Sequence, residues 1–404
     1  MKRTKTIIAA LCRTLLGLVF IFSGAVKAID PLGTVYKIED YLKAFGNFFL
    51  DLLPAAEVAA WSLIVLELLL GVCMLLNVRS RWTSCITLLF YLVMTPLTLY
   101  IAINNPVSDC GCFGDAIVLT NWQTFWKNGV LIILAIVLFA LRKHTHPLWR
   151  GWMELVIATT TIAAALSFMI WTQRHLPIQD FRPYKIGNHL PTIMEDYQED
   201  QYEYTFICMK DSVEQAFTAA NYPDSTWTLV RYESKLIKKG YDSPIHDFAI
   251  KNIDSVDITS NILESESPIT LVIMYDLQKA DREQMAKVEA LYNYTMQSYT
   301  AMHTPTPTDT MQCDTILADT ILCDETQYDE TLYETTPIQL APFYILTGSN
   351  TDEIIAFNLE YPTLSECICY CDPVTLKTIV RANPGVIVLH NGTVIDKYNL
   401  RNRN

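Results

Sequence analysis

Charged side chains are scarce in this chain: only 18% of its 404 residues are Asp, Glu, Lys or Arg, whereas 51% are hydrophobic. Basic side chains are scarcest after residue 180, where 16 Lys and Arg are outnumbered by 33 Asp and Glu; the first 180 residues hold 14 and 10. No basic face is available to neutralise phosphates, so the composition argues against a nucleic-acid partner. It indicates instead an apolar, slightly basic membrane half joined to an acidic soluble half.

Long apolar runs fill the first half of the chain. Five of them approach the ~20 residues that cross a bilayer core, and they lie at residues 7–29, 55–77, 82–104, 125–141 and 152–172. The connections among the first four are too short for a soluble domain. The sequence therefore predicts a multi-domain protein that begins with an α-helical transmembrane bundle of four helices over residues 1–145. A fifth transmembrane helix, a tether, follows within residues 146–175.

Lysine and arginine collect on alternate loops: at the N-terminus and after the second and fourth spans. Because basic loops stay in the cytoplasm, this pattern places the N-terminus inside and the loop at residues 105–124 outside. A fifth span then leaves the rest of the chain outside as well. The predicted location is the bacterial cytoplasmic (inner) membrane, with a periplasmic C-terminal region. The predicted partners are the lipid bilayer and an extracytoplasmic client protein.

The loop after the third span contains two thiols one residue apart, Cys110 and Cys112. A disulfide across one residue closes a very small, strained ring, which makes it easy to reduce, and Gly111 permits the backbone that such a ring needs. We predict that this pair is the catalytic site, as an exchangeable redox couple. A static bridge and a metal site are the alternatives, and no His flanks the pair as a further ligand. Asp109 and Asp115 are expected to raise the thiol pKa, which argues against a strongly activated thiolate.

Two ionisable residues lie within the spans, Arg13 in the first and Glu67 in the second. A carboxylate in hydrocarbon costs at least ~2.5 kcal/mol, so Glu67 is expected to face a partner. Helical rise puts Arg13 within reach of Glu67 in depth. The two residues are predicted to form an ion pair between helices or, alternatively, a polar lining for a cofactor such as the headgroup of a membrane quinone.

These residues belong to a longer pattern: Arg13-x3-Gly17-x2-Phe20-x2-Ser23-Gly24-x2-Lys27-x2-Asp30-Pro31, Glu67-x3-Gly71 and Cys110-Gly-Cys112-Phe-Gly. The pattern resembles the four-helix DoxX and MauE membrane family, and the cysteine element resembles the MauE branch. The resemblance covers residues 5–143 and implies a small membrane protein of redox or maturation pathways. MauE is associated with methylamine utilisation and with disulfide formation in its dehydrogenase. Nothing in this chain itself points to methylamine.

The external part divides in two. Residues 176–243 contain short β-rich stretches and are predicted to form a small connecting segment. In residues 244–404 strands alternate with helices and end in a hairpin about Asn391-Gly392, preceded by a predicted cis Asn383-Pro384 bond. This α/β order resembles a thioredoxin-like domain. The family would place Cys-x-x-Cys after the first strand, where residues 275–280 are Tyr-Asp-Leu-Gln-Lys-Ala, so the resemblance implies a binding role without thiol chemistry.

The remaining external cysteines have no clear redox setting. Residues 304–337 are rich in Thr and Asp and are predicted to form a mobile insertion, which a bridge between Cys313 and Cys323 would span. Cys367, Cys369 and Cys371 alternate along a predicted strand and are interpreted as small core residues; partners for the loop thiols or a metal site are the alternatives.

The sequence thus favours a membrane component of an extracytoplasmic thiol-redox or protein-maturation pathway. In this hypothesis Cys110 and Cys112 exchange electrons at the outer face and the external domain docks a client. The alternative is a non-enzymatic, membrane-anchored assembly factor in which the loop bridge is static and the external domain only binds partners. Trapped mixed disulfides distinguish the two.

Overall fold

The computed structural model describes residues 2–402, apart from residues 304–340 and short gaps at 108–109, 146–147, 150, 199–200, 211–212, 219–220, 225, 239, 242 and 246. The predicted insertion, with Cys313 and Cys323, lies outside the described residues. The chain forms two compact units. The first comprises Met1–Lys185, Lys377–Gly385 and Tyr398–Asn404, and the second comprises Ile186–Leu376 and Val386–Lys397.

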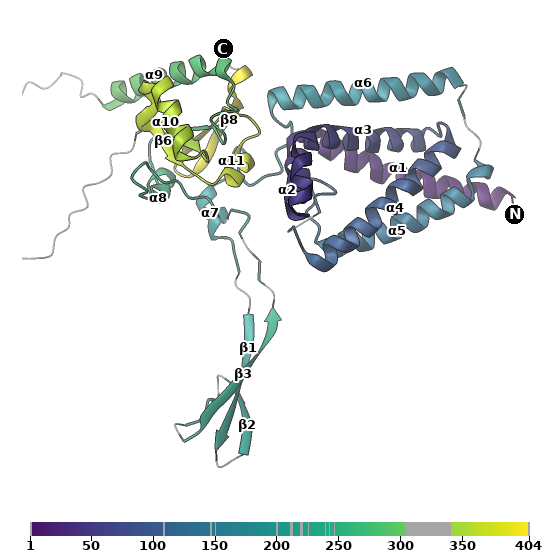
Figure 1. The fold of residues 1–404 in the computed structure, drawn as a ribbon, viewed down its shortest axis with the longest axis horizontal. Helices are drawn as coiled ribbons and strands as arrows, with labels where there is room; N and C mark the ends of the chain where they lie inside the picture. Colours follow the sequence, from purple (N-terminus) through teal and green to yellow (C-terminus); the bar gives the residue numbers. More distant parts are fainter. Residues whose placement is uncertain are drawn as a thin grey trace, which may run out of the picture. The chain divides into compact units, whose positions relative to one another are not determined.

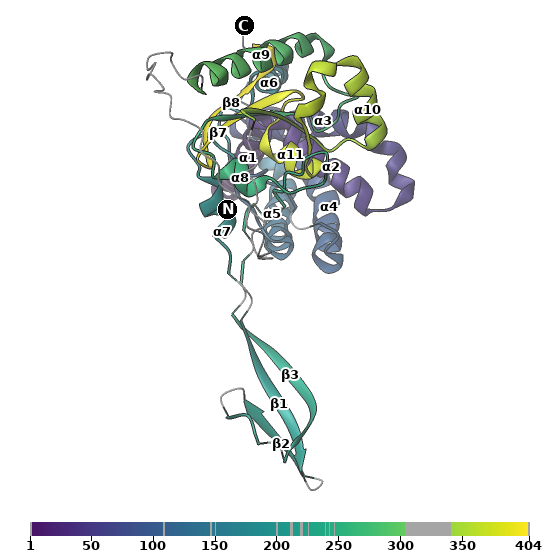
Figure 2. The ribbon, with the colours of Figure 1, turned by 90° about the vertical axis from the view of Figure 1, so that its left-hand side faces the viewer.

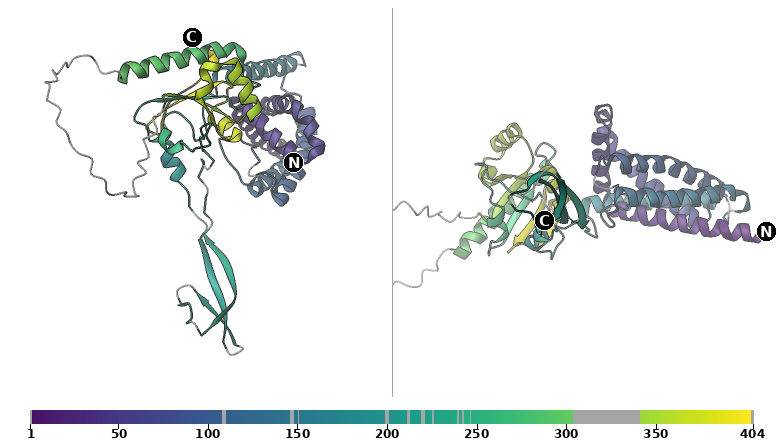
Figure 3. Two further views of the ribbon diagram at one scale, coloured as in Figure 1. Left: turned by 60° about the vertical axis from the view of Figure 1, so that its left-hand side comes forward. Right: turned by 90° about the horizontal axis from the view of Figure 1, so that it is seen from below.

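Five helices of the first unit are long and apolar enough to cross a membrane, which confirms the five predicted spans. They run alongside one another, as Figures 1 and 3 show. Their bounds are α1 (Lys2–Ile29), α3 (Ala56–Leu75), α4 (Ser80–Asn104), α5 (Asn121–Ala140) and α6 (Gly151–His175). A short 3₁₀ turn, η2 (Arg142–His144), follows α5. The protein is therefore a multi-pass membrane protein.

Helices α1 and α3 approach each other closely through glycine. A Cβ atom added at Gly24 would lie 2.8 Å from Leu68 Cγ, and one added at Gly71 would lie 2.8 Å from Ile21 Cγ1. Small residues at such contacts let backbones approach, so that van der Waals packing and short polar contacts between helices become available. Leu68 opposite Gly24 fixes the register of the antiparallel pair.

The connection between the first two spans is itself helical, which the sequence analysis did not predict. Helix α2 (Pro31–Ala44) begins after Asp30, whose side chain accepts a hydrogen bond from Gly33 N at 3.0 Å, and Pro31 occupies its first turn. This is a regular N-cap. A 3₁₀ segment, η1 (Asn47–Ala55), leads from α2 into α3. Figure 1 shows α2 across the end of the bundle that is remote from the N-terminus.

The second unit contains a separate three-stranded antiparallel sheet in the order β2-β1-β3 (Figure 2). Its strands are β1 (Gln201–Lys210), β2 (Val213–Thr218) and β3 (Thr228–Lys238), and a short helix, α7 (Leu190–Glu195), precedes them. The β-rich content predicted for this region is confirmed. Strand β3, with 11 residues, is longer than the short stretches that were expected. Cys208 in β1 is buried.

A five-stranded sheet follows in the order β6-β5-β4-β7-β8, with β4, β5 and β6 mutually parallel. The strands are β4 (Ile269–Ile273), β5 (Phe343–Thr347), β6 (Ile368–Tyr370), β7 (Gly385–His390) and β8 (Thr393–Asn399). The α-helices are α8 (Thr259–Leu263), α9 (Arg282–His303), α10 (Thr351–Glu360) and α11 (Pro373–Ile379), with 3₁₀ turns η4 (Pro362–Cys367) and η5 (Leu400–Asn402). Strands β4 and β5 are buried along their whole length, as central parallel strands are.

The last hairpin matches its prediction. Asn391 and Gly392, between β7 and β8, have φ values of 46° and 67°, the left-handed pair that a tight two-residue turn requires. The Asn383–Pro384 bond is cis. The predicted alternation of strands and helices is therefore present after residue 268.

The contact between α1 and α3 yields a stability prediction. Gly71→Ala should lower the thermal unfolding midpoint of the detergent-solubilised chain, because its Cβ would lie 2.9 Å from Ile21 N and overpacking costs ~1–3 kcal/mol. Gly129→Ala in α5 is the control: no atom lies within 4 Å of its added Cβ, and alanine favours the helix. A midpoint for Gly71→Ala at or above that of the wild type would contradict the close packing.

Candidate functional site

The two loop thiols lie side by side. The Cys110 and Cys112 sulfur atoms are 3.2 Å apart, and both residues are partly buried. Gly111 between them has a φ of 60°, a conformation that glycine adopts without strain. A Cβ at this position would also lie 2.7 Å from Lys37 Cγ of α2. The turn therefore needs glycine both for its backbone and for the helix that packs against it.

Two helices hold the backbone of the thiol loop. The Ser23 hydroxyl of α1 donates to the Cys112 carbonyl at 2.8 Å, and the Tyr41 hydroxyl of α2 donates to the Cys110 carbonyl at 2.7 Å. Each thiol-bearing residue thus has its own anchor. Ser23 belongs to the sequence pattern noted above. Tyr41 was missed because nothing in the sequence signalled that the first external loop contains a helix next to the thiols.

A buried ion pair lies beneath the loop. Lys27 Nζ contacts the two carboxylate oxygens of Glu67 at 2.7 and 2.8 Å and also donates to the Ser23 hydroxyl at 2.9 Å. The two charged side chains are only 6% and 5% exposed. The predicted pairing of Glu67 with Arg13 is wrong: Lys27 is its partner. Removing one member of such a buried pair costs ~3–5 kcal/mol, because the other charge is left uncompensated.

A cavity of about 330 Å³ extends from the thiols into the bundle. This volume is at the lower end of the ~300–1,000 Å³ typical of small-ligand sites. Residues from all of α1 to α5 line it, and most are apolar; its polar members include Lys27, Glu67, Tyr91 and the Asn128–Thr98 hydrogen-bonded pair. Tyr91 is 3% exposed. The cavity thus joins the thiols to an apolar chamber with a few polar groups.

The electrostatic environment gives the two thiols different pKa values. The hydrogen bond from Cys110 lowers the pKa of Cys112 to about 6; burial opposes this shift, and the positive charges of Lys127 and Lys27 assist it. The same hydrogen bond, together with burial, raises the pKa of Cys110. Cys112 is therefore the thiolate of the pair, and Cys110 holds the proton. The two aspartates were expected to raise the thiol pKa, but for Cys112 the paired thiol and the two lysines give a net lowering.

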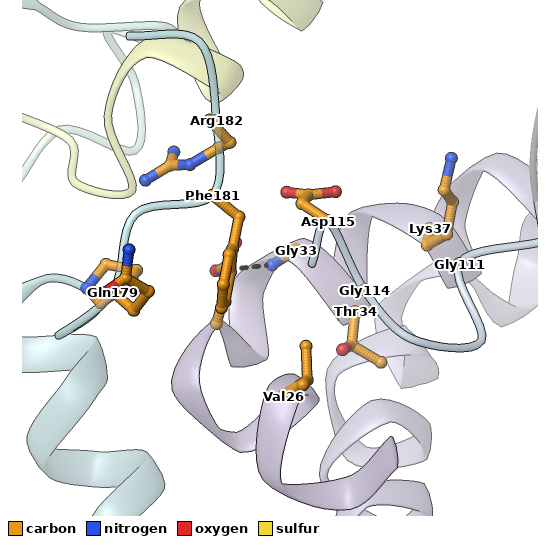
Figure 4. Close-up of a pocket in the computed structure, with 12 residues that line it drawn as sticks. Val26, Gly33, Thr34, Lys37, Gly111, Gly114, Asp115, Gln179, Phe181 and Arg182 are labelled. Atoms are coloured by element: carbon orange, nitrogen blue, oxygen red, sulfur yellow. Dashed lines mark hydrogen bonds between the residues drawn. The ribbon is translucent and has the colours of Figure 1, made fainter. Parts of the chain in front are cut away.

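Asp115 faces a different cluster. Arg381, in the 377–385 segment of the first unit, contacts Asp30 at 2.9 Å and Asp115 at 3.4 Å. Burial opposes ionisation of Asp30, but Arg381 and Arg182 lower its pKa on balance. Figure 4 shows Asp115 and Arg182 among the residues around a pocket of about 30 Å³ beside this cluster. The pocket has room for roughly one or two water molecules. Asp109 lies outside the described residues.

Arg13, predicted to line a cofactor site with Glu67, lies elsewhere. It lines a second cavity with Asn77 and Lys143 and is absent from the lining of the thiol cavity. Of the predicted site residues, the structure therefore brings together Cys110, Cys112 and Glu67. Lys27 and Tyr91 join them. Lys27 was visible in the sequence as part of the helical pattern, whereas Tyr91 carried no signal beyond an aromatic residue in a span.

The three external cysteines near β6 are buried in the second unit. Only Cys369 lies within the strand; Cys367 ends η4 and Cys371 follows β6, so the predicted run of three alternating strand positions is wrong. Burial raises the pKa of Cys367 to about 11 and that of Cys369 and Cys371 to about 12. They fit the interpretation as small core residues, since reactive thiols need a lowered pKa and access.

Comparison with known families agrees with this division of the chain. The family model described as methylamine utilisation protein MauE matches residues 5–141, which include α1 to α5. A model described as Domain of unknown function (DUF8463) matches residues 202–239, the three-stranded sheet. No curated protein and no solved structure matches the chain. Residues 5–141 are thus MauE-like and support a membrane protein of that kind, and the thioredoxin-like character of residues 244–404 stays a prediction.

The asymmetry of the thiols can be tested by alkylation. Only the thiolate reacts, so a pKa lowered to about 6 from the usual 9.0 predicts that iodoacetamide labels Cys112 at half-maximal rate near pH 6 in the reduced chain. Cys110→Ala should move this midpoint upward, because it removes the hydrogen bond to the thiolate. Cys85→Ala, in α4, is the control and should leave it unchanged. Peptide mass spectrometry gives the rates; a wild-type midpoint near pH 9 would contradict the assignment.

Proposed function

We propose that this protein is a membrane thiol-redox component of an extracytoplasmic protein-maturation pathway, with Cys110 and Cys112 as its reactive pair. The observation that carries the proposal is the placement of two adjacent thiols, of opposite protonation preference, at the head of a membrane cavity. A static structural bridge needs neither a cavity nor a cation beside it. A redox couple uses both: the cation stabilises the thiolate, and the cavity admits an electron acceptor.

The exchange step follows from the pKa order. In the oxidised state a client thiolate attacks the Cys110 sulfur of the Cys110–Cys112 disulfide. A client–Cys110 disulfide forms and Cys112 leaves as the thiolate, because the thiol of lower pKa is the better leaving group. The second client thiolate then attacks the client sulfur of this mixed disulfide and releases Cys110, which takes up a proton. The client gains one disulfide, and the loop pair gains two electrons.

A membrane quinone is the proposed acceptor of these two electrons. The Cys110 thiol, the Cys112 thiolate, the quinone and one further proton yield the loop disulfide and the quinol. The lining of the cavity suits this ligand: apolar and aromatic walls accept the ring, and the Tyr91 hydroxyl offers a donor to one of its carbonyl oxygens. Sites of this kind combine a mostly apolar wall with few polar groups.

The external domain is proposed to recognise the client. A thioredoxin-like assignment of residues 244–404 is supported by the order of the sheet and by the segment preceding β7. At residues 275–280, where that family carries its dithiol, Lys279 pairs with Asp276 and no cysteine is present. Binding without thiol chemistry is the corresponding role.

The proposed orientation in the bacterial inner membrane, with the thiols and this domain in the periplasm, follows the basic loops. From the description of the matched family we propose an accessory role in protein maturation for this chain. Methylamine utilisation is the first pathway to test.

Trapping tests the exchange. In cells that express the full chain, Cys112→Ala should accumulate mixed disulfides, because Cys110 can still attack a client disulfide and release one client thiolate, while the Cys112 thiolate that would attack Cys110 and release the client is missing. Cys110→Ala should accumulate far fewer. Non-reducing gels followed by mass spectrometry identify the adducts, and the double variant is the blank. Equal trapping by both single variants would contradict the role of Cys112, and full function of the double variant without any adduct would favour the static assembly factor.

Two tryptophan substitutions, one inside the cavity and one outside it, test whether a quinone is reduced there. Leu63→Trp should slow reduction of a short-chain ubiquinone by the dithiol at least tenfold, because Leu63 lines the cavity. Val58→Trp, on the same helix and 69% exposed, should leave the rate unchanged. Quinone absorbance gives the rate in detergent, and alkylation of Cys112 reports whether the loop is intact. Equal rates in both variants with an intact loop would reject the quinone as the acceptor. The client-trapping experiment tests the thiol exchange independently of this result.

A further inference from the structure

A second cavity lies at the other end of the helix bundle. Its volume is about 600 Å³, and its lining comes from the start of α1, the end of α3 and the segment after α5: Thr6, Ala10, Arg13, Asn77, Lys143, His144, Thr145 and Leu148. None of these eight residues is an Asp or a Glu, whereas three are basic. The thiol chemistry makes no use of this cavity.

Arg13 is the decisive residue of this cavity. Its Nε and Nη1 atoms are buried and have no hydrogen-bond partner among the described residues. A guanidinium stays protonated in proteins, and a buried charge without a partner is strongly unfavourable. Glu67, the carboxylate first expected to pair with it, is held by Lys27. The cavity therefore presents a cation that the described part of the chain leaves uncompensated.

The surroundings of the cavity indicate what kind of anion fits. Leu11 in α1 and Trp152 in α6, two of the helices that begin at this end, are 60% and 66% exposed, and Leu148 in the lining is 72% exposed. These side chains suit acyl chains rather than water. Arg13 and Lys143 in the lining are basic, whereas Arg79, at the same end of the bundle, already pairs with Glu154 at 3.3 Å. Clusters of basic residues beside membrane helices bind anionic lipid headgroups.

We propose that this cavity binds the phosphate headgroup of an anionic phospholipid, with Arg13 as the central contact and Lys143 at the rim. Guanidinium donors form charge-assisted hydrogen bonds to phosphate oxygens, and the lysine adds a second positive charge. The acyl chains follow the apolar surface beside Leu148. In the proposed orientation this end lies in the cytoplasmic leaflet, whose anionic lipids attract basic segments. The inference is independent of the thiol reaction.

The test uses the purified full chain in detergent. Phosphatidylglycerol should raise the thermal unfolding midpoint in a concentration-dependent manner, because a ligand that binds only the folded state stabilises it. Arg13→Gln should weaken the apparent affinity about tenfold or more, since it removes the charge-assisted hydrogen bonds to the phosphate. Arg81→Gln, which removes an exposed charge at the same end, is the matched control and should bind like the wild type. Native mass spectrometry counts the bound lipids.

Three results would overturn the proposal: an equal shift with phosphatidylethanolamine, an equal shift with inorganic phosphate alone, or unchanged lipid affinity in Arg13→Gln. The second result would identify a soluble phosphate site instead of a lipid site. If Arg13→Gln does not fold, Lys143→Gln takes its place, because Lys143 is exposed and its substitution leaves the bundle packing intact. This variant should bind phosphatidylglycerol several-fold more weakly, and unchanged binding would count against the site.

Discussion

The buried contact between Lys27 and Glu67 organises the membrane half of this protein. Neither charge is tolerable in hydrocarbon alone, so α1 and α3 are held where the ammonium and the carboxylate meet. The glycine contacts at Gly24 and Gly71 bring the two helices close enough for the pair to form. Because Lys27 also reaches Ser23, which holds the Cys112 carbonyl, the same contact fixes the height of the thiol loop above the cavity.

The two ends of the bundle handle charge differently. At the thiol end each buried charge has a counter-charge: Lys27 with Glu67, and Asp30 with Arg381. At the other end Arg13 has none among the described residues. A closed set of charges favours a rigid, preorganised environment, which suits a reactive pair whose pKa order must be maintained. A cation without a counter-charge instead favours binding of an anion from outside the chain. The cavity beside the thiols thus contains paired charges, whereas the cavity with Arg13 has an excess of positive charge.

Reactivity of cysteine in this chain depends on surroundings and not on residue type. Cys112 has a thiol donor at 3.2 Å and two lysines acting on it, and its pKa falls. Cys369 and Cys371 lie in an apolar interior without such partners, and their pKa values rise to about 12. The same side chain therefore has a lowered pKa in the loop and a raised pKa in the sheet domain, and a lowered pKa is what the proposed thiol exchange requires.

The amino-acid sequence by itself determined the five spans, the thiol loop and the final hairpin, because each depends on neighbouring residues or on a helical or strand period. It did not determine the partner of Glu67. Arg13 and Lys27 are 14 residues apart and share one face of α1, so periodicity cannot choose between them, although they differ in depth by roughly 20 Å. Only the tertiary register decided: Leu68 opposite Gly24 places Glu67 beside Lys27. Likewise, the thiolate character of Cys112 arises from α1, α2 and α5 converging on the loop, and no local pattern encodes that convergence.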